Sequence, residues 1–284
     1  MNTSAPIHLA WLACGSADVK VQARYAAESA LAWQGDAPLA LHVYTDHARA
    51  FAPLARDGVE VVEVGPETER GWRGPEDLVF RMKPCIALDL ARRFPSEPVG
   101  LVDADTFFVA PVAELAARVA SGRAVMHLRE YHVGTEPTDQ MKKFRRAMSK
   151  LSFRGRPVDL DAFMWNSGVL LVHPAQFPLL EEWLAFVDAI YPQYRKAFVE
   201  QYGVGLLLQK RAEVVACDDL VFHYWFQKDE YVAAIRDELA ALDRLPVAAQ
   251  GDYLRAHRLA LPPPVERKHK RKSLWARFRA ALGR

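Results

Sequence analysis

Short apolar runs alternate with longer amphipathic segments along the first 120 residues of the chain. The runs that predict buried strands lie at 7–13, 39–46, 59–65 and 99–102. The segments that predict helices lie at 19–33, 83–94 and 111–120. Alternation of strands and helices is typical of a mostly parallel sheet covered by helices on both faces. The pattern therefore predicts an α/β protein.

The second half of the chain is less regular. Apolar runs at 123–128 and 164–174 predict further strands, and 213–225 predicts one or two short ones. Helical patterns lie at 140–150, inside a polar stretch from 129 to 162, and then at 175–190, 196–210 and beyond 225. The proline-rich segment 261–266 marks the end of the fold. We expect one domain over 1–260 and an appended tail over 261–284.

The net charge of the whole chain is small, but the charge of the tail is strongly positive. The chain has 284 residues, of which 51% are hydrophobic and 25% charged, enough for a sizeable core. Its formal net charge of +2 gives no indication of a nucleic-acid-binding protein. The tail from Glu266 to Arg284 holds eight Lys or Arg and one acid, a net +7, which leaves −5 for residues 1–265.

The spacing of the cysteines and the pattern of the first residues favour a cytoplasmic location. The three cysteines, Cys14, Cys85 and Cys217, are widely spaced, which favours a reducing compartment over a disulfide framework or a zinc site. The first 15 residues carry no basic region before their apolar stretch, so a first strand is favoured over a signal peptide. No run is long enough to predict a transmembrane helix.

Two carboxylates, Asp103 and Asp105, follow the apolar run at 99–102 directly. Ligands of open α/β sheets bind beyond the carboxyl ends of the strands. Side chains two residues apart in a strand share one side, and two carboxylates that close repel unless a cation lies between them. Hard cations such as Mg²⁺ and Mn²⁺ prefer such oxygen ligands. The alternative is a solvated turn in which Asp103 caps the next segment.

Three segments together resemble one enzyme family. "GLVDADTFFVAPV" resembles the DxD segment of GT-A glycosyltransferases, "WNSGVLLVHP" their Asn-small-Gly strand, and "FHYW" their late metal-ligand histidine. The group that is most similar contains glycogenin and the bacterial lipooligosaccharide galactosyltransferases, and the resemblance covers roughly residues 7–228. It implies a GT-A, Rossmann-like fold and metal-dependent sugar transfer from a nucleotide sugar, with UDP-sugar as the expected donor.

The resemblance also implies roles for individual residues. Asp103, Asp105 and His223 would hold Mn²⁺ or Mg²⁺; the alternative for His223 is a core histidine. The residues implied to contact the nucleotide sugar are Ala13, Cys14, Tyr25, Asp46, Lys83, Asp103, Ala104, Asn166, Ser167 and Gly168. The backbone of Ala13 and Cys14 and the ring of Tyr25 would meet the nucleotide, and Asp46 would accept a hydrogen bond from base or ribose. The alternatives are that Tyr25 belongs to the core and that Asp46 caps the next helix.

The other implied roles concern the diphosphate and the reacting sugar. Lys83 is the expected ligand of the pyrophosphate, with Arg81 as its competitor, and the alternative for Lys83 is a solvated lysine in the first turn of a helix. Asn166, Glu200 and Gln201 would lie at the reacting sugar, and the alternative for Glu200 is a capping role in the first turn of a helix.

The segment "HYWFQKDEY" departs from the family pattern. It lacks the Gly and the Pro-Trp that usually follow the histidine, and Lys228 stands one place earlier than the family's phosphate-binding lysine. Retention or inversion at the sugar therefore stays open. The alternative functions are a sugar nucleotidyltransferase and a non-catalytic GT-A scaffold.

The acceptor is expected to be a glycan, and the tail suggests that it is lipid-linked. From Ser273 onward, apolar residues recur at three- and four-residue intervals among arginines, which predicts a basic amphipathic helix suited to an anionic membrane surface. We therefore expect a cytoplasmic protein at the inner face of the membrane. The alternatives are a disordered tail and a helix docked on the body.

Overall fold

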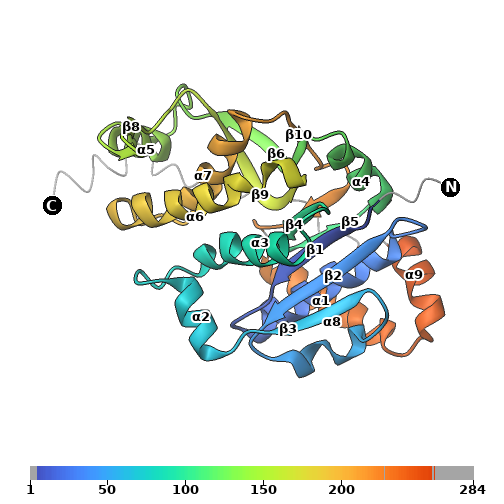
Figure 1. Ribbon diagram of the computed structural model, residues 1–284. Helices are drawn as coiled ribbons and strands as arrows, with labels where there is room; N and C mark the ends of the chain where they lie inside the picture. The colour runs from blue at the N-terminus through green and yellow to red at the C-terminus, as the bar shows by residue number, and fades with distance from the viewer. Residues whose placement is uncertain (1–4, 227, 258, 260–284) are drawn as a thin grey trace, which may run out of the picture.

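A seven-stranded sheet runs through the centre of the protein (Figure 1), seen in a computed structural model that describes residues 5–226, 228–257 and 259. In spatial order its strands are β10 (Val214–Ala216), β6 (Ala124–His132), β9 (Phe163–Val172), β4 (Val99–Val102), β1 (Ile7–Leu12), β2 (Leu39–Thr45) and β3 (Val59–Glu63). β9 is antiparallel to β4 and β6, and the other neighbouring pairs are parallel. The predicted α/β class, with a mixed and mostly parallel sheet, is confirmed.

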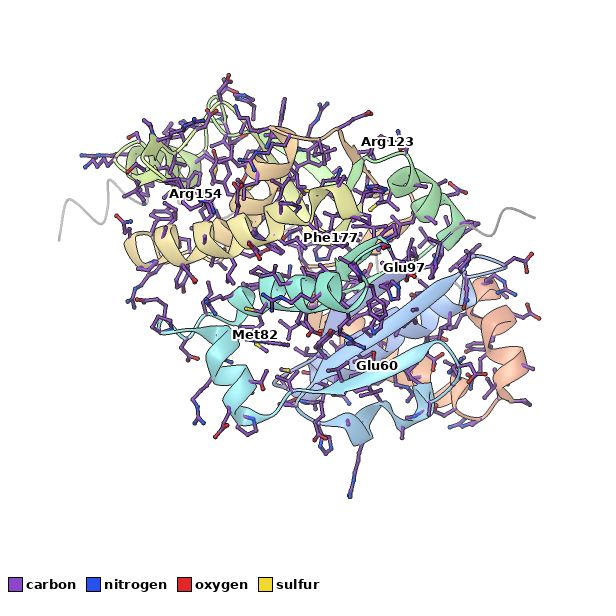
Figure 2. The ribbon with its side chains drawn as sticks, viewed as in Figure 1. Glu60, Met82, Glu97, Arg123, Arg154 and Phe177 are labelled. Atoms are coloured by element: carbon purple, nitrogen blue, oxygen red, sulfur yellow. The ribbon has the colours of Figure 1, made fainter. Side chains whose placement is uncertain are left out.

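Helices cover both faces of this sheet, and side chains fill the space between the layers (Figure 2). One face is covered by α1 (Ala17–Ala32) and α4 (Val112–Ala120), and the other by α3 (Met82–Arg93), α6 (Pro178–Ile190) and α7 (Phe198–Gln209). The remaining helices are α2 (Pro66–Arg73), α5 (Asp139–Met148), α8 (Lys228–Leu242) and α9 (Val247–Ala256). α8 and α9 pack against α1.

The alternation of side chains in β1 explains this two-layer packing. Leu9 and Trp11 are buried in the core that contains α1, whereas Ala10, between them, is buried in the core that contains α3. The chain leaves β1 through Gly15, whose φ of +102° is readily available only to glycine. Ser16 then caps α1 by accepting a hydrogen bond from the N–H of Val19.

The topology brings several strand ends to one edge of the sheet. β1, β2, β4 and β6 all run in the same direction, so their carboxyl ends lie at that edge, where the antiparallel β9 begins. A second small sheet lies beyond β4. It pairs β5 (Thr106–Phe108) antiparallel with β11 (Val221–His223), and it places His223 opposite Thr106.

The structure differs from the sequence prediction in its short elements. The pattern did not indicate α2, β5 or the hairpin of β7 (Ser152–Phe153) and β8 (Arg156–Pro157). β6 extends to His132 instead of ending at 128, because register shifts let a strand continue through polar residues. The tail predicted over 261–284 lies outside the described residues. No helix in the described part of the chain combines the length and apolar content that crossing a membrane requires.

Candidate functional site

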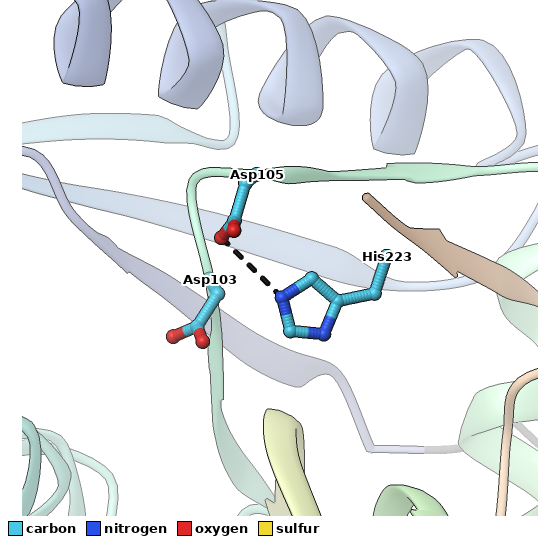
Figure 3. Close-up of side chains that lie close together, drawn as sticks. All are labelled: Asp103, Asp105 and His223. Carbon is cyan, nitrogen blue, oxygen red and sulfur yellow. Dashed lines mark ion pairs between the residues drawn. The ribbon is translucent and has the colours of Figure 1, made fainter. Parts of the chain in front are cut away.

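Asp103, Asp105 and His223 converge just beyond the carboxyl end of β4 (Figure 3). A potential ligand atom of each lies within 4.8 Å of those of the other two. Asp103 follows β4 directly, and its backbone N–H donates to the carbonyl of Gly168 at 2.8 Å. Asp105 precedes β5 and His223 ends β11, so the pairing of these two strands brings the carboxylate and the imidazole together.

Hydrogen bonds fix the orientation of the His223 imidazole. Its Nδ1 lies 3.1 Å from Oδ1 of Asn166, and this amide oxygen also accepts the backbone N–H of Gly168 at 2.9 Å. Because an amide oxygen only accepts, Nδ1 must carry the proton. Nε2 is then the ring nitrogen that faces Asp105, whose Oδ1 is 3.4 Å away, and it is the nitrogen available to a cation. A fixed outer hydrogen bond of this kind is typical of metal-ligating histidines.

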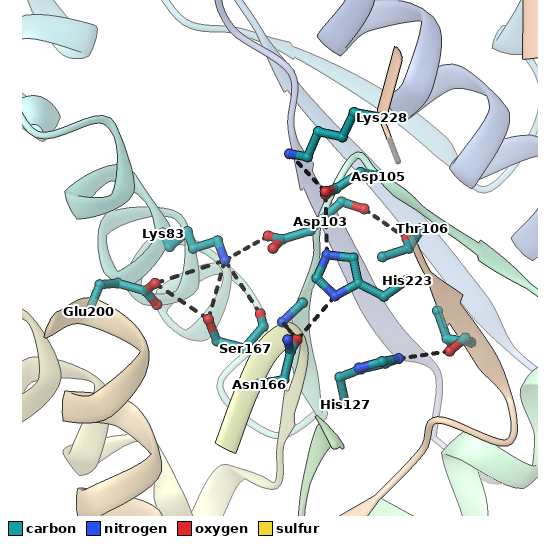
Figure 4. A network of polar contacts seen from close by, with 12 residues as sticks. Lys83, Asp103, Asp105, Thr106, His127, Asn166, Ser167, Glu200, His223 and Lys228 are labelled. Carbon is teal, nitrogen blue, oxygen red and sulfur yellow. Dashed lines mark hydrogen bonds and ion pairs between the residues drawn. The ribbon is translucent and has the colours of Figure 1, made fainter. Parts of the chain in front are cut away.

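Two lysines balance the charge of the two aspartates (Figure 4). Nζ of Lys83 lies 2.6 Å from Oδ1 of Asp103, and Nζ of Lys228 lies 2.8 Å from Oδ2 of Asp105. Burial works against the charged form of Lys83, but Asp103 and Glu200 still hold its pKa above the usual value. Burial also works against ionised Asp105, yet His223 and Lys228 hold its pKa well below the usual range.

The residues present fit a divalent cation. Carboxylate oxygens suit Mg²⁺ and Mn²⁺, and the imidazole nitrogen favours Mn²⁺ of the two. Gly168 supports the same reading, because a Cβ at this position would collide with the imidazole of His223 and would lie 2.9 Å from Oδ1 of Asn166. The strand thus has a glycine where the histidine must approach its backbone.

Glu200 and Gln201 both lie in the first turn of α7, but Glu200 contacts Lys83 and Ser167, whereas Gln201 contacts Glu130. Glu200 is 2% exposed, and its Oε2 lies 3.4 Å from Oγ of Ser167 and 4.0 Å from Nζ of Lys83. Its other oxygen is buried and accepts no hydrogen bond from the part of the chain that the structure describes. Burial raises the pKa of Glu200 to about 7. Glu200 therefore contacts Lys83 and Ser167 from the side away from Asp103 (Figure 4).

Glu130, near the end of β6, is a site residue that the sequence did not indicate. Its two oxygens accept hydrogen bonds from Nδ2 of Asn166 at 3.2 Å and Nε2 of Gln201 at 3.3 Å. Burial raises its pKa. Its half-buried carboxylate thus joins the two amides that were predicted to meet the sugar. A predicted strand that continued from 128 to 130 would have placed Glu130 at the same edge of the sheet as the other site residues.

The residues predicted to bind the nucleotide lie in two different environments. Asp46, after β2, accepts the N–H of Gly15 at 3.1 Å and pairs with Lys20 at 2.8 Å, at the same sheet edge as Asp103. Burial disfavours ionised Asp46, but the hydrogen bonds from Lys20 and Gly15 lower its pKa. Cys14 is half-buried, and burial raises its thiol pKa to about 12, so it would offer a nucleotide backbone groups, not a thiolate.

Ala13 and Tyr25 require a correction. The N–H of Ala13 donates to Tyr44 and its carbonyl accepts from the hydroxyl of Thr45, so both backbone groups are already used within the sheet. Tyr25 is 3% exposed and packs edge-on against Phe107, 5.8 Å between ring centres. Its ring has no free face for a base, because the helix turns it into the core.

Arg81 and Ala104 are the remaining candidate residues, and both side chains contact other parts of the fold. Arg81 binds Asp188 with two nitrogens, at 2.5 and 2.9 Å, and also donates to the carbonyls of Gly71 and Trp72. It therefore anchors the start of α3, while Lys83 is the cation that reaches the site. Ala104 is half-buried between the two aspartates and packs against the core.

The sequence matches no model of a known protein family, and it matches no curated protein.

Proposed function

We propose that the protein is a metal-dependent glycosyltransferase of the GT-A type. It would transfer a sugar from a nucleotide sugar, expected to be a UDP-sugar, to an acceptor hydroxyl. The observation that supports this most is the convergence of Asp103, Asp105 and His223 at the carboxyl end of β4. This is the sheet edge where α/β folds bind ligands, and the donor set suits a cation that binds a diphosphate.

Charged and polar side chains around this cluster have distinct roles in the proposal. Lys83 is held by Asp103 and Glu200, and its ammonium provides a fixed positive charge for the diphosphate. A divalent cation bound at the cluster would neutralise the charge that develops on the leaving diphosphate. Asp46, beyond β2, would accept from base or ribose, as the resemblance to GT-A enzymes implies.

Asn166, Gln201 and Glu130 would bind the reacting sugars. The amides of Asn166 and Gln201 both donate to the carboxylate of Glu130, so all three groups are held in one place. Such a set can bind sugar hydroxyls as donor and as acceptor. Positioning the attacking hydroxyl would lower the entropic part of the barrier. Glu200 would act by positioning Lys83, since its side chain is buried behind that residue.

The expected acceptor is a glycan, and the basic tail makes a lipid-linked glycan the favoured one. Such an acceptor would place the enzyme at the cytoplasmic face of a membrane. This part of the proposal rests on the sequence of residues 266–284.

Hydrolysis of nucleotide sugars tests the proposed activity. A panel of UDP- and GDP-sugars is incubated with the full chain in Mn²⁺ and in EDTA, and the free nucleoside diphosphate is measured. We expect release that requires Mn²⁺ with at least one donor. Asp105→Asn should remove about 99% or more of it while the chain stays folded, because the substitution removes a metal ligand but keeps the shape of the side chain. A moderate fall in melting temperature is expected from the loss of the ion pair with Lys228.

Each alternative predicts a different result. A nucleotidyltransferase would release pyrophosphate from UTP and a sugar 1-phosphate. A scaffold protein would bind UDP with no turnover in either condition. Near-wild-type hydrolysis by Asp105→Asn would contradict the metal role, and loss of the folded state in this variant would indicate a structural carboxylate.

A further inference from the structure

The two lysines of the site differ in how firmly they are held. The side chain of Lys83 is 7% exposed, and its Nζ also lies 3.4 Å from the carbonyl of Ser167. The side chain of Lys228 is 52% exposed and reaches Asp105 from outside. Among the side chains that the structure describes, Asp105 is the one carboxylate within ion-pair distance of Lys228. Lys228 can therefore leave the site for water, whereas Lys83 cannot.

The place of Lys228 in its helix points the same way. It is the first residue of α8, where the helix dipole disfavours a positive charge. Local helix stability thus does not explain a lysine here. Its Nζ lies 2.8 Å from Oδ2 of Asp105, while Nε2 of His223 lies 3.4 Å from the other oxygen of the same carboxylate. The ammonium and the imidazole thus share one carboxylate.

The charges in the site suggest that Lys228 and a divalent cation compete for Asp105. Asp103 and Asp105 contribute two negative charges, and Lys83 and Lys228 contribute two positive ones. Glu200, 4.0 Å from Lys83, adds a further negative charge when it is ionised. A divalent cation at the cluster would still leave excess positive charge close together. The least costly response is for the exposed ammonium of Lys228 to leave Asp105. A diphosphate arriving at the same edge would then neutralise the excess.

We propose that Lys228 is an internal counter-ion of Asp105 that competes with the divalent cation, so that metal and nucleoside diphosphate bind cooperatively. The inference rests on the proposed function only in taking this cluster as the place where a cation and a diphosphate meet. Lys228 weakens metal binding to the empty site, and once displaced it is free to pair with the incoming anion. By linkage, the nucleotide strengthens metal binding by the same factor as the metal strengthens nucleotide binding.

Binding of Mn²⁺ to the full chain tests the inference without an activity assay. Free Mn²⁺ is measured by electron paramagnetic resonance, with and without UDP, for the wild type and for Lys228→Met. Without UDP, the variant should bind Mn²⁺ about three- to tenfold more tightly, as expected for the loss of an ion pair with one buried partner. The factor by which UDP strengthens Mn²⁺ binding should shrink.

Two further variants separate competition from general charge effects. Lys142→Met removes an exposed lysine from α5 that pairs with Asp139 at 3.6 Å, and it should leave Mn²⁺ affinity unchanged. Lys228→Arg keeps the cation and should behave as the wild type. Equal or weaker Mn²⁺ binding by Lys228→Met, or equal tightening by Lys142→Met, overturns the inference while the metal site stands. If neither the wild type nor Lys228→Met binds Mn²⁺, the metal site itself is refuted, and the competition with it.

Discussion

Gly168 is the residue whose size matters most in the site. The carbonyl of Gly168 accepts from Asp103 and its N–H donates to the side chain of Asn166, so the backbone cannot move away. The imidazole of His223 occupies the space that a Cβ would need. A methyl group at Gly168 must therefore displace His223.

Gly168→Ala should lower Mn²⁺ affinity by at least about tenfold, because the imidazole can no longer approach Asp105. Displacing one buried side chain by a methyl group costs about 1–3 kcal/mol of stability, so the melting temperature should also fall by several degrees. Gly65→Ala is the matched control, since a Cβ there meets no atom within 4 Å. Unchanged Mn²⁺ affinity in Gly168→Ala would show that His223 is not a ligand.

His223→Ala distinguishes a metal ligand from a core histidine. If Nε2 completes the metal site, the variant should lose Mn²⁺ affinity by at least about tenfold while UDP binding measured without metal stays nearly constant. Calorimetry with each ligand separately decides the matter. Equal loss of both affinities would indicate that His223, which is 6% exposed, mainly supports the packing around it.

At the scale of elements, the sequence predicted the first part of the site well and the second part poorly. The apolar run at 99–102 followed by two aspartates correctly indicated a central strand that ends in carboxylates. The run could not indicate that the next three residues form β5 and pair with β11, more than 100 positions later. Three-residue strands have no recognisable periodicity, and their pairing is decided by tertiary packing. The resemblance of "FHYW" to a known motif, not a strand pattern, pointed to His223.

The lysine contacts and Glu130 had no local signal for a related reason. Lys83 precedes a helical apolar pattern and was found as a candidate, but its pairing with Asp103 depends on how α3 packs against β4. Glu130 lies in a strand made irregular by register shifts, which hides the alternation of side chains. Ala13 was misplaced, and for Tyr25 the core alternative holds, because a sequence pattern does not show which backbone groups and ring faces are already occupied.

Buried histidines near the β3 edge of the sheet predict a pH dependence of stability. His42 in β2 lies opposite Glu60 in β3 and 3.0 Å from His8 in β1, and Figure 2 labels Glu60 on this edge. Burial lowers the pKa of His42 to about 4. The unfolded histidine binds a proton near pH 6.5, so between about pH 6.5 and 4 the His42 side chain holds more protons in the unfolded chain than in the folded one. The contribution of His42 to stability should therefore fall as the pH drops through this window, whereas the raised pKa of Glu200 acts in the opposite direction.

Urea unfolding between pH 4 and 8 measures this effect. The shift of His42 corresponds to at most about 3 kcal/mol, and buried His127, whose pKa burial also lowers to about 4, acts in the same direction. His42→Gln should make the pH dependence clearly shallower, whereas Gln in place of the exposed His47 should not. A slope unchanged by His42→Gln would assign the acid sensitivity to other groups.

At the scale of the whole molecule, one edge of the sheet brings together the side chains of the proposed site. The order of strands places β4 next to both β1 and β9, so the aspartates after β4 lie between Asp46 on one side and Asn166 on the other. The donor would lie over β1 and β2, and the acceptor near β9 and β6. The predicted nucleotide contacts within 13–46 and sugar contacts within 166–201 came from the resemblance to GT-A enzymes, and the strand order places the two groups on opposite sides of β4.

The distribution of charge between body and tail leads to a prediction about membranes. Residues 266–284 carry a net +7, with an apolar face formed by Leu274, Trp275, Phe278 and Leu282 if the segment is helical. Each basic side chain near an anionic surface contributes on the order of 1 kcal/mol, and salt weakens it. We therefore expect the full chain to sediment with vesicles containing phosphatidylglycerol at low salt and less so at high salt. A chain ending at Val265, with an unchanged melting temperature, should stay in the supernatant with neutral and anionic vesicles alike. Equal partitioning of the two chains on anionic vesicles would refute the membrane role of the tail, and it would leave a freely diffusing acceptor as the better expectation for the site.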